Sequence, residues 1–170
     1  MLDPERLMRM LDDPNSNPAW KLDALLDLER LDDVRVVPFL LKVLAQSVQP
    51  TSVRIAVLRG VTERSLAPQE RIAVALELVA VVEDRLQGET HLRDQACIAL
   101  ADFTDSAAAV QCLGAIARDS SEVFELRYSA FTSLQRAGPT AECLQILADL
   151  CGDETLGSAA EGVLRRWRGQ

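Results

Sequence analysis

Residues 92–100 read LRDQACIAL, and this stretch decides the fold because its pattern returns along the chain. A large apolar residue is followed by a base, by a small apolar residue at the fifth position and by an apolar residue at the ninth. Spacings of three and four place these residues on one face of an α-helix. The pattern starts at residues 20, 53, 92, 126 and 156, so successive copies lie 33, 39, 34 and 30 residues apart.

A second apolar pattern alternates with the first. It consists of an apolar pair and, three residues after the second member, an apolar-Ala pair; it occupies residues 40–45, 75–80, 112–117 and 143–148. A degenerate copy at 7–12 ends in Asp12 instead of Ala. Turn residues separate the patterns; at 14–18, for example, Asn17 fits a helix cap and Pro18 a first helical position. The start and stop signals predict about ten helices.

The two patterns together predict a stack of helical hairpins. One hairpin cannot bury its own apolar stripe, whereas neighbouring hairpins bury it as a continuous core. We therefore expect an all-α, right-handed α-solenoid of about five hairpins in a single domain over residues 1–170. The expected repeats cover about 3–31, 34–65, 68–105, 107–137 and 140–168.

The period, the hairpin layout and the L-R-x-x-A-x-x-x-L second helix resemble HEAT-like repeats over about residues 3–168. Pro38 also looks like the first-helix proline of such repeats. An acid eight residues before the second-helix base recurs from Asp13 to Lys21 and from Asp119 to Arg127, which is similar to the Asp/Arg ladder of that family. The resemblance implies a scaffold fold and leaves its partner open, because the family binds many unrelated partners.

The charge balance bounds the class of partner. Eighteen bases against 26 acids give a formal charge of −8, which disfavours binding to nucleic acid or to an anionic membrane. The densest apolar stretch, residues 72–82, has 11 residues and is interrupted by Glu77, too short for a spanning helix. The first ten residues carry acids where a signal peptide needs bases. These features predict a cytoplasmic protein with neither a nucleic-acid nor a membrane partner.

The four cysteines and the single histidine, His91, show no metal-ligand spacing. The cysteines sit in apolar helical context and are interpreted as reduced core thiols. No GxGxxG, P-loop or GxSxG motif is present. We therefore predict no metal, no cofactor, no catalytic residue and no enzymatic activity.

The bases fall into two groups. Residues 165–168 form a basic cluster that suits the end of a helix, with Trp167 covering the end of the core. The recurrent second-helix bases could line a groove as an anion ladder, but each lies beside a core position with acids near, and structural ion pairing is the preferred interpretation. These bases are Lys21, Arg54, Arg93 and Arg127.

The side of each second helix opposite the stripe supplies the candidate site, since this side faces the concave surface in HEAT-like repeats. Several of its residues are apolar, which is unusual for a solvated face and typical of a protein interface. Burial by neighbouring helices is the open alternative. The candidate partner-binding residues are Leu22, Leu26, Ile55, Arg59, Ile98, Asp102, Tyr128 and Arg136.

These observations predict a non-catalytic scaffold that binds a protein or peptide through its second helices. A partner with a basic segment fits the charge of −8, and the chain itself is expected to be a monomer or an end-to-end homodimer. The alternative is an accessory or lyase-type protein that handles a tetrapyrrole or other small ligand, because one HEAT-like branch resembles phycobilin lyases. A nucleic-acid-binding role like that of basic HEAT-repeat DNA glycosylases is disfavoured, because acidic residues outnumber basic ones in this chain.

Overall fold

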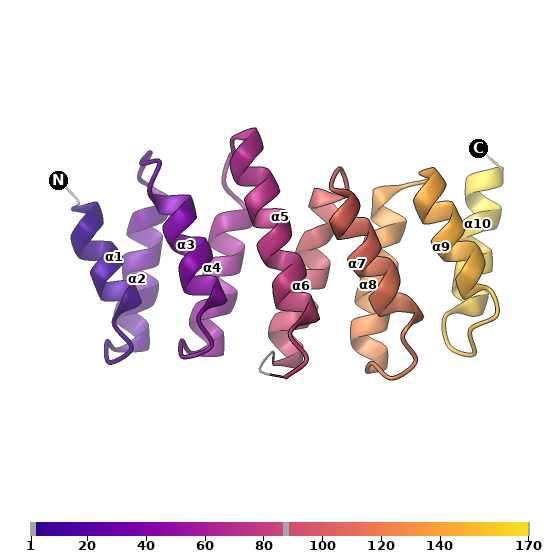
Figure 1. Cartoon of the computed structure of the whole chain (residues 1–170), viewed down its shortest axis with the longest axis horizontal. Coiled ribbons are helices and arrows are strands. Elements are labelled where there is room, and N and C mark those ends of the chain that lie inside the picture. The colour runs from indigo at the N-terminus through magenta and orange to yellow at the C-terminus, as the bar shows by residue number, and fades with distance from the viewer. Residues whose placement is uncertain (1–2, 87–88, 170) are drawn as a thin grey trace.

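The computed structural model describes residues 3–86 and 89–169, and this part of the chain forms ten α-helices in two layers (Figure 1). One layer holds the first helix of each hairpin: α1 (Pro4–Asp12), α3 (Val36–Ala45), α5 (Pro68–Glu83), α7 (Ala107–Arg118) and α9 (Ala141–Leu150). The other layer holds α2 (Pro18–Glu29), α4 (Thr51–Thr62), α6 (Thr90–Leu100), α8 (Phe124–Ala137) and α10 (Gly157–Arg168). A short 3₁₀ helix, η1 (Ala101–Phe103), follows α6. The prediction of an all-helical α-solenoid of five hairpins is confirmed.

Side-chain caps start several of the helices where the sequence indicates. The Asn17 side chain accepts a hydrogen bond from the Ala19 amide at 2.9 Å, and Pro18 is the first residue of α2. Thr140 Oγ1 accepts one from the Cys143 amide at 3.2 Å at the start of α9. Each cap satisfies an amide that the helix itself leaves without a partner.

The core runs along the array between the two layers. Val53, Leu92, Leu126 and Leu156, which begin the second-helix pattern, are all buried. Trp20 holds the same position in the first copy but is 61% exposed, so its prediction as a core residue is wrong. Each of the four buried positions follows another hairpin of the array, whereas no described helix precedes α1–α2.

The second-helix bases are buried, which agrees with their interpretation as structural groups rather than as an anion-binding ladder. The Arg93 guanidinium donates to the Val82 carbonyl at 2.7 Å and to both carboxylate oxygens of Glu122, at 2.5 and 3.1 Å. Arg127 repeats this arrangement with the Ala117 carbonyl at 3.0 Å and Asp153 at 2.5 Å. Each base therefore joins its own hairpin to the turn of the next one.

The partners within this ladder differ from the predicted ones. Asp119 pairs with Arg85 at 2.6 Å rather than with Arg127. The acid that pairs with Arg127 is Asp153, 26 residues further along the chain. The Lys21 ammonium donates to Gln49 Oε1 at 2.5 Å, 28 residues further on, rather than to Asp13. The base points toward the following hairpin, so its partner belongs to the next repeat.

The four thiols are free, and three of them, Cys97, Cys112 and Cys143, are buried. Burial raises the pKa of the Cys97 thiol well above its ordinary value and that of Cys112 to about 12. The interpretation as core thiols is confirmed for these three, whereas Cys151 is half-buried at the edge of the core. No group of three His, Cys, Asp or Glu side chains in the described residues could hold a metal ion.

Each range expected for a repeat contains one helix pair, and the single-domain organisation stays a prediction. Across residues 3–86 and 89–169, no helix combines the length and apolar character needed to cross a bilayer.

Two glycines of α10 differ in their surroundings and give a matched test of the packing. A Cβ on Gly157 would lie 2.6 Å from the Cys151 carbonyl oxygen, whereas one on Gly162 would meet nothing within 4 Å. Gly157→Ala is expected to lower the free energy of unfolding by about 1–3 kcal/mol. Gly162→Ala should raise it by up to about 1 kcal/mol through helix propensity. Urea denaturation followed by circular dichroism measures both, and equal stability of the two variants would contradict the close approach at Gly157.

Candidate functional site

A groove of about 380 Å³ runs between α2 and α4, in the layer of second helices. It brings together four of the eight predicted site residues, Leu22, Leu26, Ile55 and Arg59. Its remaining lining residues are Leu25, Glu29, Ser52, Ala56, Gly60 and Glu63.

The helix register explains this apolar groove. Leu22 and Leu26 are four residues apart on α2, so they lie one above the other on the same face. Leu26 is exposed and Leu22 half-buried, whereas Ile55 on α4 is only 9% exposed and belongs to the hydrophobic core. The expectation that Ile55 stands on an open face is therefore wrong, because the packing of α2 against α4 covers it.

Two carboxylates, Glu29 and Glu63, line the same groove. The half-buried Glu29 carboxylate lies directly over Gly60, where any Cβ would collide with it. Burial raises the pKa of Glu29 above its ordinary value, and the charge of Glu63 raises it further. The positive charge of Arg64 offsets part of this rise in pKa. Its guanidinium does not bind the Glu29 carboxylate; it donates to the backbone carbonyl oxygens of Glu29 and Leu31, each at 2.9 Å. Among the described residues, no hydrogen bond reaches the Glu29 carboxylate.

The arrangement combines an apolar trough with negative charge. Leu22, Leu26 and the edge of Ile55 can contact an aliphatic chain, and Glu29 with Glu63 can receive a cation at its end. Lysine and arginine side chains have this composition, an apolar stem with a charged head.

The other four predicted residues form a separate area over α6 and α8. Arg136 forms an ion pair with Asp102 in η1 at 2.8 Å, and both groups are exposed. Ile98 is 41% exposed, and Tyr128 is exposed and stacks on Phe124 with ring centroids 5.7 Å apart. This second area thus holds an ion pair flanked by apolar and aromatic side chains.

The Arg59 guanidinium donates to Gln95 Oε1 at 3.0 Å and so bridges α4 to α6 between the two areas. Ile55, the apolar residue of α4 in the predicted strip, is covered. The eight residues therefore make two areas rather than one continuous apolar strip.

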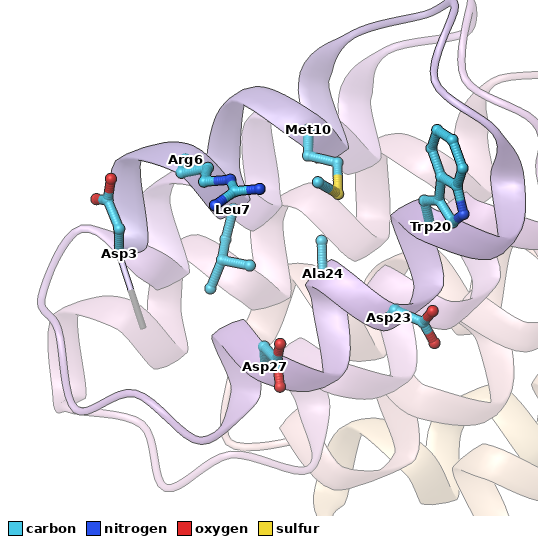
Figure 2. Close-up of a pocket in the computed structure, with 8 residues that line it drawn as sticks. All are labelled: Asp3, Arg6, Leu7, Met10, Trp20, Asp23, Ala24 and Asp27. Atoms are coloured by element: carbon cyan, nitrogen blue, oxygen red, sulfur yellow. The ribbon is translucent and has the colours of Figure 1, made fainter. Parts of the chain in front are cut away.

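Sequence reasoning missed a larger groove, of about 580 Å³, on the N-terminal hairpin (Figure 2). Figure 2 shows Trp20, Asp23, Ala24 and Asp27 on α2 facing residues of α1 across it. The one available signal is Trp20 itself, since the other copies hold Val or Leu at its position. The rest of the lining consists of Arg6, Leu7 and Met10 on α1 and of Asp3, the N-cap of that helix.

Comparison with known proteins adds one solved structure. The fold resembles that of human deoxyhypusine hydroxylase, solved in complex with glycerol. The likeness covers 98% of this chain and 96% of that chain, with 14% sequence identity and a TM-score of 0.44. No family model and no curated protein matches the chain.

This comparison corrects the functional prediction. Deoxyhypusine hydroxylase is an enzyme, which runs against the prediction of a non-catalytic scaffold without enzymatic activity, and that prediction is withdrawn. The tetrapyrrole alternative gains no support from it. At this identity and TM-score the likeness concerns the helical fold alone, and the hydroxylase reaction is a property of that protein.

Proposed function

We propose that the α2–α4 groove binds a lysine or arginine side chain of a polypeptide partner. The observation that carries the proposal is the half-buried Glu29 carboxylate, which has a raised pKa and lies beside Glu63 in an apolar groove. The aliphatic stem of the bound residue contacts Leu22 and Leu26, and its cation lies beside the two carboxylates. The net charge of −8 supports a basic partner.

Electrostatics gives the reason for a cationic ligand. The Glu29 carboxylate loses hydration through burial and is repelled by Glu63, so its pKa is raised and its ionised form is less stable than that of an exposed glutamate. A bound ammonium or guanidinium group would reverse both effects by charge-assisted hydrogen bonding. An anionic or purely apolar ligand would offer no such gain, which sets the preferred charge of the partner.

The area over α6 and α8 is the proposed second contact of the same partner. Ile98, Tyr128 and Phe124 offer exposed apolar surface, and the Asp102–Arg136 pair borders it. Aromatic rings contribute strongly at protein interfaces because they combine a large apolar area with few rotatable bonds.

Two broader assignments belong to the same proposal. We assign the chain to the HEAT-like repeats, supported by the helical hairpins and by the buried ladder of second-helix bases. We place it in the cytoplasm, supported by four free thiols, since reducing compartments keep cysteines unpaired.

Binding is tested with ¹⁵N-labelled full chain and two probes, acetyl-Leu-Arg-Leu-amide and acetyl-Leu-Glu-Leu-amide. The arginine probe is expected to give saturable shifts of backbone amides in α2 and α4, and the glutamate probe none. The double variant Glu29→Gln/Glu63→Gln should weaken binding about fivefold, as expected for loss of partly exposed charge pairs. The matched control is Glu142→Gln, an exposed residue of α9, which should bind as the unmodified chain does. Equal shifts with both probes would contradict the proposal.

The proposal also fixes a pH dependence. Because a cation favours ionised Glu29, binding should strengthen as the pH rises through the raised pKa of that group, above its ordinary 4.5. Titrations of the arginine probe at several pH values measure this trend. In Glu29→Gln the trend should be reduced, and an affinity that falls with rising pH would contradict the assignment.

A further inference from the structure

The groove on the N-terminal hairpin has an apolar floor and an acidic rim (Figure 2). Leu7, Met10 and Ala24 contribute the apolar part. Asp3, Asp23 and Asp27 against one base, Arg6, leave the lining with a formal charge of −2, since one positive and three negative groups sum to that value. The groove therefore suits a cationic and partly apolar occupant.

Trp20 identifies what kind of surface this groove is. In the four later copies, each of which follows another hairpin, the same pattern position is at most 1% exposed; in α2 the indole is 61% exposed. The groove thus occupies the place where another helical hairpin of the array would pack. A hairpin of the same architecture is the occupant that fits.

The opposite end of the chain carries such a hairpin with the complementary charge. Glu161, Arg165 and Arg168 follow the spacing of one helix face on α10, and together with Ala148, Cys151 and Leu164 they line a groove of about 370 Å³. Arg166 is also exposed in the last turn. Figure 1 shows α1–α2 and α9–α10 at opposite ends of the array.

The chain already uses ion pairs of this polarity between its own repeats. Arg85 after α5 pairs with Asp119 after α7, and Arg118 of α7 pairs with Asp149 of α9, both at 2.6 Å. In both pairs, as in the buried ladder of second-helix bases, the base belongs to the earlier repeat and the acid to the later one. Three exposed pairs have the reverse order: Asp12–Lys42, Glu5–Arg35 and Asp102–Arg136. Ion pairs of either order thus join successive hairpins, and a basic last hairpin placed before an acidic first hairpin would add one of the base-before-acid kind.

We propose that the α9–α10 hairpin of one copy packs on the α1–α2 groove of a second copy. The arginines of α10 then face Asp23 and Asp27, and Trp20 is covered as its counterparts are within the array. The contact is heterologous, so each added copy leaves one acidic and one basic end free. Such a contact builds open chains or rings rather than a closed dimer.

The test is the concentration dependence of mass, measured by sedimentation velocity from micromolar to near-millimolar protein. Mass is expected to grow beyond that of a dimer, and added salt should reverse the growth. The acidic-end variant Asp23→Lys/Asp27→Lys and the basic-end variant Arg165→Glu/Arg168→Glu should each stay monomeric. The combined four-residue variant restores opposite charges at the two ends and should associate again.

A matched control carries the same charge change outside both end hairpins. Asp32→Lys/Glu83→Lys alters two exposed residues and should associate at least as well as the unmodified chain. Circular dichroism and the melting temperature establish that every variant is folded. A chain that stays monomeric at all concentrations overturns the proposal. Association in either single-end variant, or none in the folded four-residue variant, overturns it as well.

Discussion

Replacing Arg93 by alanine is expected to lower the free energy of unfolding by about 3–5 kcal/mol. The side chains of Arg93 and Glu122 are each 7% exposed and are joined at 2.5 Å. Without the guanidinium, the Glu122 carboxylate stays buried with less compensation, and the Val82 carbonyl loses its donor. Arg85 also contacts Glu122 at 3.2 Å, which places the expected loss toward the lower end of the range.

Urea denaturation of Arg93→Ala and of Arg59→Ala measures this loss against a matched control. Arg59 is an exposed arginine on α4 with one hydrogen bond to Gln95, and its removal should change the stability by no more than about 0.5 kcal/mol. Equal effects of the two substitutions would contradict the role of Arg93 as a buried link between successive hairpins.

Ile55→Glu is expected to destabilise the fold by about 3–5 kcal/mol, because it removes buried apolar contacts and places a carboxylate at a core position that is only 9% exposed. Ile98→Glu makes the same chemical change at a side chain that is 41% exposed, and the melting temperature should stay close to that of the unmodified chain. Thermal denaturation followed by circular dichroism measures both variants.

Comparing Ile55→Glu with Ile98→Glu separates an effect on stability from an effect on binding. Ile98→Glu should fold normally and weaken contact with a polypeptide partner at the area over α6 and α8. Ile55→Glu should lose binding only together with its fold. Comparable melting temperatures for the two variants would show that Ile55 is as open as Ile98, contrary to the packing of α2 on α4.

Local signals made the helices predictable from the sequence. The Asn17-Pro18 start and the spacings of three and four act within one or two turns of chain, so they need no knowledge of the tertiary structure. The repeat added long-range information, because two patterns in step imply that every hairpin packs in the same way.

The ladder partners and the exposure of Trp20 were not predictable in this way. Arg127 binds Asp153 because the next hairpin brings its turn to the guanidinium, and the sequence distance of 26 residues reflects that stacking. Trp20 follows the core pattern and differs only in what covers it. Both features depend on neighbours in space.

The candidate site was predicted in part for the same reason. The helix wheel identified Leu22, Leu26 and Arg59 on one side of the second helices, and the structure places them in one groove. Glu29 was missed because its significance comes from Gly60 on the adjacent helix, which leaves room for the carboxylate. The interhelical contact, rather than either helix, makes this part of the site.

The central claim is that Glu29 receives a cation in the α2–α4 groove. The most direct test is the carboxyl ¹³C chemical shift of Glu29 followed across a pH titration, with and without saturating acetyl-Leu-Arg-Leu-amide. In the free protein the pKa should lie above 4.5, and it should fall when the probe is bound. A Glu29 pKa that stays unchanged at saturation would contradict the claim.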